Sequence, residues 1–145
     1  MAKWTDHLPK LAVAVIVLGG AAVLVSKVTG GNTAIETVNV NVPTKLSVKA
    51  ERGAKVFADN CAACHGDSAS GSDKGPPLIH NIYNPGHHGD ESFFLAMQQG
   101  VRQHHWPYGN MPPQKQVNAT MAGNIITYIR ELQAANGIVY QQHRM

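Results

Sequence analysis

The segment Cys61-Ala62-Ala63-Cys64-His65 constrains this chain more than any other feature of its sequence. Two cysteines three positions apart share one helical turn, and a histidine follows directly. This C-x-x-C-H spacing is the pattern for covalent attachment of c-type haem, in which each cysteine forms a thioether and the histidine binds the iron. We therefore predict one haem c, attached through Cys61 and Cys64, with His65 as an iron ligand.

Other uses of a cysteine pair fit the sequence less well. A thioredoxin-like redox pair requires a βαβ pattern around it, which the flanking residues do not have. A structural zinc site needs four ligands, and a disulfide scaffold needs more cysteines than the two that the chain contains. Haem attachment is the interpretation that the spacing favours.

Length and charge narrow the class of protein further. The chain has 145 residues, which is enough for one modest domain, and 43% of them are hydrophobic. The formal net charge of +3 lies entirely within residues 1–50, so residues 51–145 have no net charge. The basic pI of about 9.0 is therefore no sign of a nucleic-acid-binding surface.

The N-terminal region contains a long apolar stretch. Residues 11–25 are continuously apolar, and the stretch from Leu8 to Val28 would form a helix about 31 Å long, which matches a bilayer's hydrocarbon thickness. We predict an uncleaved single-pass membrane anchor over residues 1–28. A cleaved signal peptide is the main alternative, because a 15-residue apolar run is also at the upper limit for such peptides. A buried core helix is a third and weaker interpretation.

Residues 29–50 are predicted to form a linker between the anchor and a folded domain. Thr37 to Pro43 alternates apolar and polar residues with a period of two, which is typical of a short strand. Pro43 and the lack of a partner strand favour an extended tether instead. As a flexible coil the linker would span about 26 Å, which lets an attached domain move near a membrane surface.

Residues 51–145 are predicted to form a small all-α domain. Helical patterns occur at Glu51–Asn60, at Glu91–Gly100 and from about Asn118 to Gly137. The connections between them are rich in Gly, Pro, His and Asn, and such long loops are unusual in a small domain unless something large fills its centre. A cofactor would supply that missing core.

The ordered set of motifs in residues 51–145 resembles a class I monohaem cytochrome c of the membrane-anchored type. The motifs are ERGAKVFADNCAACHG, then GPPL, then YGNMPP, then an amphipathic C-terminal helix. The resemblance implies a few helices around one covalent haem, with the first and last helices crossing closely. Gly53 and Phe57 match the glycine and the aromatic residue of the family's first helix, and Tyr128 matches the aromatic residue of its last.

The resemblance also implies further haem-binding residues. Met111, in the proline-stiffened YGNMPP loop, matches the family's axial methionine and would be the second iron ligand. Pro76 matches the proline whose carbonyl oxygen accepts the hydrogen bond of the ligand histidine, and Leu78 would pack on the haem. Trp106 and Tyr108 either bind haem propionates, as aromatic residues before the methionine loop do in some members, or are ordinary core or surface aromatics.

Histidine is the main rival to Met111, because the chain contains eight histidines. Five of them lie in loops between the predicted helices, and a solvent-facing position is the simpler interpretation for each: His80, His87, His88, His104 and His105. Either histidine pair could bind a metal, but the sequence pattern identifies no third ligand.

The expected function is single-electron transfer rather than catalysis, because protein ligands on both sides of the iron leave no position for a substrate. By family resemblance, the chain would be a membrane-anchored carrier between respiratory or photosynthetic redox complexes. Its haem domain would face the periplasm from the cell inner membrane, and its partners would be those complexes and the lipid bilayer, with no nucleic acid and no small-molecule substrate. The alternatives are a fixed cytochrome c subunit of a larger membrane oxidoreductase complex and, less favoured, a haem gas sensor or peroxidase.

Overall fold

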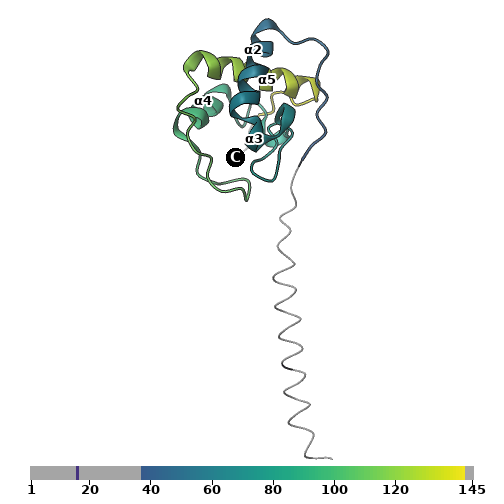
Figure 1. The fold of residues 1–145 in the computed structure, drawn as a ribbon. Helices are drawn as coiled ribbons and strands as arrows, with labels where there is room; N and C mark the ends of the chain where they lie inside the picture. The colour runs from purple at the N-terminus through teal and green to yellow at the C-terminus, as the bar shows by residue number, and fades with distance from the viewer. Residues whose placement is uncertain (1–15, 17–36, 143–145) are drawn as a thin grey trace, which may run out of the picture. The chain divides into compact units, whose positions relative to one another are not determined.

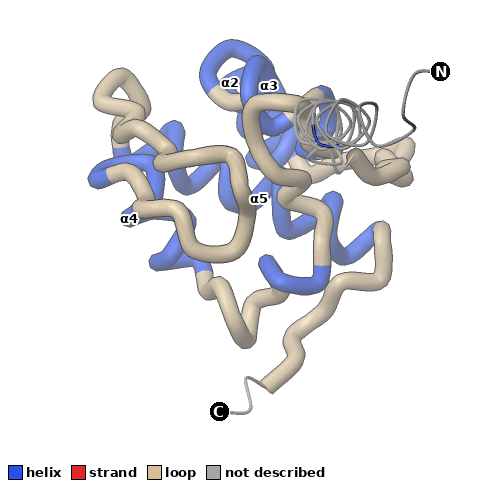
Figure 2. The backbone as a smooth tube through the Cα atoms, turned by 90° about the horizontal axis from the view of Figure 1, so that it is seen from below, coloured by secondary structure: helices blue, strands red, loops and turns tan. Residues whose placement is uncertain are grey.

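The computed structural model describes Ile16 and residues 37–142, and residues 37–142 form an all-helical domain. The longer helices are α2 (Val48–Asn60), α4 (Asp90–Gln99) and α5 (Ala119–Ala135). Three shorter elements are α3 (Ala62–His65) and the 3-10 turns η2 (Asp67–Ala69) and η3 (Asn81–Tyr83). Figure 2 shows how much of the domain consists of loops between these helices. In the described residues, the β-structure is limited to one isolated bridge between Val101 and Met111.

Helices α2 and α5 cross at the centre of the domain (Figure 1). The crossing is close because Gly53 has no side chain: a Cβ there would lie 2.9 Å from Cβ of Tyr128 and would also collide with the backbone carbonyl of Asn124. Phe57 and Tyr128 pack beside it with ring centroids 5.7 Å apart. The close crossing predicted from Gly53, Phe57 and Tyr128 is present in the structure.

Capping residues explain where the two crossing helices begin. Ser47 precedes α2, and its hydroxyl accepts a hydrogen bond from the backbone N–H of Ala50 at 3.2 Å. Asn118 caps α5 in the same way through the N–H of Met121 at 3.0 Å. Helix α5 ends at Ala135, and Gly137 then adopts a φ of +75°, a conformation that suits glycine.

The structure differs from the sequence prediction before α2. Residues 37–50 were expected within the tether, but α2 begins at Val48, and the preceding residues contain no strand and lie along the domain. Val38 donates a backbone hydrogen bond to the Ser70 carbonyl at 2.9 Å, and the Asn136 side-chain oxygen accepts one from the N–H of Asn41 at 2.8 Å. Such long-range hydrogen bonds are not visible in local sequence pattern.

The predicted membrane anchor lies outside the described residues apart from Ile16. Among the helices that the structure does describe, none combines the length and the apolar character needed to cross a bilayer. The anchor and the first part of the linker therefore remain predictions from sequence.

Candidate functional site

The C-x-x-C-H segment forms a single tight turn at the end of α2. Cys61 terminates α2, and its N–H donates to the Phe57 carbonyl at 2.8 Å. Helix α3 then holds the rest of the motif, with the His65 N–H bonded to the Cys61 carbonyl at 2.9 Å. Gly66 ends this turn with a φ of +74°. The two cysteines and the histidine therefore lie together on one short, hydrogen-bonded turn.

The two cysteines differ in their surroundings. Cys61 is half-buried and lines the main cavity, whereas Cys64 is exposed and lines a smaller cavity beside it. Burial, and to a lesser extent the neighbouring Cys64, raises the pKa of the Cys61 thiol to about 11. Before haem is attached, Cys61 is therefore a neutral thiol at pH 7.

The imidazole of His65 is held in one orientation. Its Nδ1 lies 2.9 Å from the carbonyl oxygen of Pro76, which can only accept a hydrogen bond. The proton is therefore on Nδ1, and the lone pair of Nε2 is available to a metal. Burial lowers the pKa of His65, although the bond to Pro76 opposes this effect. His65 is thus a neutral imidazole in one orientation, and the contact expected for Pro76 from the family resemblance is present.

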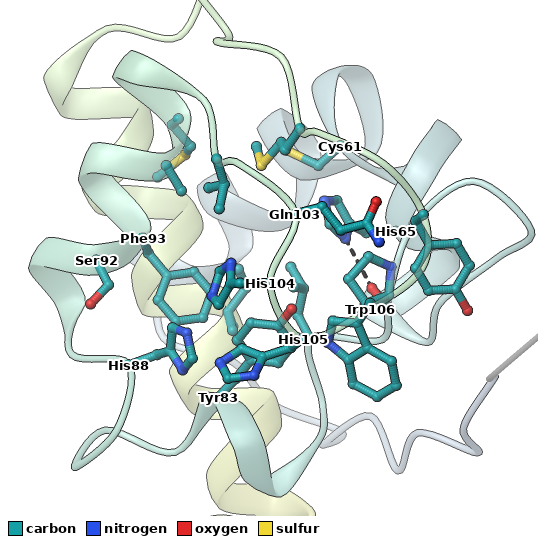
Figure 3. A pocket seen from close by; sticks show the side chains of 18 of the residues that line it. Cys61, His65, Tyr83, His88, Ser92, Phe93, Gln103, His104, His105 and Trp106 are labelled. Atoms are coloured by element: carbon teal, nitrogen blue, oxygen red, sulfur yellow. Dashed lines mark hydrogen bonds between the residues drawn. The ribbon is translucent and has the colours of Figure 1, made fainter. Parts of the chain in front are cut away.

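An apolar cavity of about 310 Å³ adjoins this turn (Figure 3). Every haem-binding residue predicted from the sequence lines it except Cys64, which lines the smaller cavity. Helices α2, α4 and α5 and the loop of residues 101–111 all contribute to its walls. A concave, mainly apolar site with a few converging polar groups is the usual form of a cofactor pocket.

Met111 reaches the cavity on a loop that is bonded back to the end of α4. Its N–H and carbonyl both pair with Val101 at 2.9 Å, which makes the isolated bridge. Gly100 permits this approach, because its φ is +77° and a Cβ would lie 2.5 Å from the Met111 carbonyl oxygen. These contacts hold the backbone of Met111 against Val101 and Gly100.

Trp106 presents a buried hydrogen-bond donor at the cavity. Its indole nitrogen Nε1 is buried and makes no well-formed hydrogen bond within the described chain. Burial raises the pKa of Tyr83 to about 12, and an interaction with Trp106 partly offsets that rise. Figure 3 shows Trp106 and Cys61 at opposite ends of the pocket. A buried donor without a well-formed partner, across the pocket from Cys61, is a group that a carboxylate of a bound haem could satisfy.

These observations together fit a covalently attached haem. The attachment cysteines, an oriented histidine, a methionine and an unsatisfied polar group surround one apolar space. Tyr108 also lines that space, near Trp106 with ring centroids 6.5 Å apart.

Two polar residues of α5, which were not predicted from the sequence, bond to the backbone of residues that line the cavity. Arg130 donates to the carbonyl oxygens of Tyr83 at 2.9 Å and His88 at 2.5 Å, and it pairs with Asp90 at 2.8 Å. The buried amide of Gln133 donates to the Leu78 and Tyr83 carbonyls at 3.0 and 3.1 Å. The available signal was that both residues lie close to the apolar stripe of α5. Their hydrogen-bond partners could not be predicted, because these are distant in the sequence.

The comparisons with known proteins agree with this site. The family model described as "Cytochrome c" matches residues 50–133, which is more than half of the chain. A 31-residue segment is 55% identical to the Cbb3-type cytochrome c oxidase subunit FixP of Bradyrhizobium sp. (strain ORS 278). That segment is 21% of this chain and only 11% of the relative. The search of solved structures found no match.

Proposed function

From the premise that this chain belongs to the cytochrome c family and carries one haem c attached through Cys61 and Cys64, we propose that it is a membrane-anchored electron-transfer protein. We assign His65 and Met111 as the axial ligands of the iron. The observation that carries this proposal is the meeting of His65, Met111 and Cys61 at one apolar cavity.

Haem c supplies a one-electron Fe(II)/Fe(III) couple, and the chain's own residues determine how that couple behaves. Pro76 orients His65 and keeps its Nε2 unprotonated. The bridge to Val101 holds the Met111 loop, so both ligands are positioned before any electron moves. The cavity wall is mainly apolar and includes the buried Leu78 and Met97. Ligands held in place in an apolar site keep structural rearrangement small when the charge changes.

The anchor proposal rests on residues 1–28, whose apolar run is long enough to cross a bilayer. Attachment of haem c takes place on the outer side of bacterial energy-transducing membranes, so we place the haem domain in the periplasm. Hydrogen bonds from Val38 and Asn41 hold the described part of the predicted linker against the haem domain, so the tether that we propose is shorter than residues 29–50.

A second candidate function is a fixed subunit of a larger membrane oxidoreductase. The short identity with an oxidase subunit favours it, as does the lack of net charge in residues 51–145. A diffusing carrier usually docks through a charged face that speeds its encounters with partners. Both functions require the same haem chemistry. They differ in whether the protein binds its redox partners transiently or stays bound to them as a subunit.

The test is the intact mass and native size of the haem-stained band from detergent-solubilised membranes. A mass equal to the full chain plus one haem, in a particle that migrates alone, supports the anchored carrier. The same mass within a large assembly supports the fixed subunit. A mass lacking about the first 30 residues contradicts the anchor.

Carbon monoxide provides the test against a gas sensor or peroxidase. A reduced protein with Met111 on the iron should show no spectral change when carbon monoxide is added. Rapid carbon monoxide binding by the native protein would contradict Met111 ligation and would favour the sensor or peroxidase.

A further inference from the structure

Four histidines from two separate parts of the chain meet beside the haem cavity. His87 and His88 lie just before α4, and His104 and His105 lie in the loop that follows it. The rings form a continuous group, with centroids 5.4 Å apart for His87 and His105, 5.3 Å for His88 and His105 and 4.2 Å for His104 and His105. Figure 3 shows His88, His104 and His105 side by side at one end of the pocket. The structure thus brings together the two histidine pairs that the sequence left apart.

Three of these rings have a spacing that suits one metal ion. One ring nitrogen from each of His87, His88 and His105 lies within 4.8 Å of the other two. The Nε2 atoms of His87 and His105 are 3.4 Å apart. Two nitrogens bound to a tetrahedral zinc ion at about 2.0–2.1 Å are themselves separated by about 3.3–3.4 Å. The separation of the His87 and His105 nitrogens therefore equals the one that a shared metal requires, and the nitrogen of His88 lies within 4.8 Å of both.

Hydrogen bonds fix which nitrogen of the third ligand is available. His88 Nδ1 lies 2.7 Å from the Ile82 carbonyl oxygen, which can only accept, so Nδ1 carries the proton and Nε2 keeps its lone pair. A ligand histidine that donates its other N–H to a carbonyl is the usual arrangement at protein metal sites. Arg130 holds the same segment by donating to the His88 carbonyl.

The charge state of the cluster suits metal binding as well. Burial is the largest cause that lowers the pKa of both His88 and His105, and the neighbouring histidines lower them further. Neutral imidazoles are the form that binds metal ions. In the described residues no carboxylate belongs to the group, so nitrogen is the ligand type that the site offers.

We propose that His87, His88 and His105 bind one divalent transition-metal ion of the zinc or copper class at the rim of the haem cavity. Imidazole ligands suit these two ions, and three protein ligands leave a fourth position for water. This site is separate from His65 and Met111, and it goes beyond the proposed electron-transfer function. His88 and His105 also line the haem cavity, so a bound ion would lie beside the haem edge.

The simpler explanation is a hydrogen bond between His87 and His105 with no metal. Calorimetric titration of the haem-loaded full chain with Zn²⁺, after treatment with EDTA, separates the two. We expect one strong site per chain, weakened at least tenfold in His87→Asn and in His105→Asn. The matched control is His80→Asn, which removes a histidine outside the cluster and retains an acceptor for the Ile82 N–H, and it should bind Zn²⁺ as the wild type does.

Electron paramagnetic resonance with one equivalent of Cu²⁺ provides a second measurement. The spectrum should show splitting from three nitrogens in the wild type and from fewer in His105→Asn. The absence of a stoichiometric site, or a site that persists unchanged in both cluster variants, would overturn the proposal. Neither result would affect haem attachment or the His65 and Met111 assignments, since these are measured from the haem spectrum of the same samples.

Discussion

Gly53 of α2 lies against Tyr128 of α5 with no room for another carbon atom, since a Cβ on Gly53 would be 2.9 Å from Cβ of Tyr128. The backbone of Asn124 blocks the same space. Backbone atoms cannot move aside as a flexible side chain can, so the distance between the two helices depends on this glycine. The helix crossing in turn positions Phe57 and Ile125, which both line the haem cavity.

Gly53→Ala should destabilise the domain by about 3 kcal/mol, because the helices must separate to admit one methyl group. Denaturant unfolding of the haem-loaded protein, followed by far-UV circular dichroism, measures this change. Gly123→Ala in α5 is the matched control: its Cβ would meet only Lys49 Nζ at 3.9 Å. That substitution should stabilise the helix by about 0.5–1 kcal/mol. Equal effects of the two substitutions would contradict the close-crossing argument.

Arg130→Met should cost about 2–4 kcal/mol, because it leaves the His88 carbonyl without its donor and the Tyr83 carbonyl with Gln133 as its remaining donor. Only 17% of the Arg130 side chain is exposed, whereas 69% of the Asp90 side chain is. Asp90→Asn should therefore cost less than about 1 kcal/mol, as for other surface ion pairs. Thermal unfolding of the two variants measures the difference, and a large loss in Asp90→Asn alone would place the stabilisation in the ion pair instead.

The parts of the fold that were predicted from sequence depend on local pattern. The C-x-x-C-H turn is encoded by adjacent residues, and the helices were located by apolar spacing and capping residues such as Asn118. The methionine loop was found through family resemblance and lies at the cavity.

The parts that were missed depend on tertiary contacts. The histidine cluster forms only because the segments on either side of α4 fold back toward each other. His104 and His105 are exposed as expected, but their meeting with the half-buried His87 and His88 was not predicted. Arg130 bonds to the carbonyl oxygens of Tyr83 and His88, which are more than 40 residues away from it in the sequence. The hydrogen bonds that hold Val38 and Asn41 against the domain are equally distant in sequence. No periodicity in the chain signals contacts of this kind.

Met111→His should lower the midpoint reduction potential by more than about 0.1 V, within the ~0.8 V range that axial ligands span. A thioether ligand favours reduced iron, and a second imidazole removes that preference. Spectroelectrochemical titration measures the potential. Met121→Leu is the control, because Met121 packs against the core and does not line the cavity, and its potential should not change. An unchanged potential in Met111→His would show that Met111 is not a ligand.

Trp106→Phe should lower the midpoint potential by an amount on the order of tens of millivolts, where 59 mV corresponds to a tenfold change in a one-electron equilibrium. The substitution keeps an aromatic ring but removes the buried indole N–H, which has no other well-formed partner in the described chain. Without that donor, the negative charge of a haem carboxylate would be less well neutralised and oxidised iron would be favoured. A potential equal to the wild-type value would show that Trp106 is only a packing residue.

The domain should lose stability as the pH falls below about 6.5, and His88 should account for part of that loss. Burial lowers the pKa of His88 in the folded protein, the hydrogen bond to the Ile82 carbonyl opposes this effect, and the neighbouring histidines His87, His105 and His104 lower the pKa further. Between the lowered pKa and the ordinary value near 6.5, the unfolded chain binds a proton at His88 that the folded chain does not. Stability therefore rises with pH through this window and is fully present above it.

Chemical denaturation between pH 7.5 and 5, in the presence of EDTA, measures this dependence. His88→Gln should unfold with a smaller pH slope than the wild type, because glutamine does not titrate. Raising the salt concentration should reduce only the part that arises from the neighbouring histidines, since burial is not screened by ions. A His88→Gln slope equal to that of the wild type would show that His88 keeps its ordinary pKa in the folded domain.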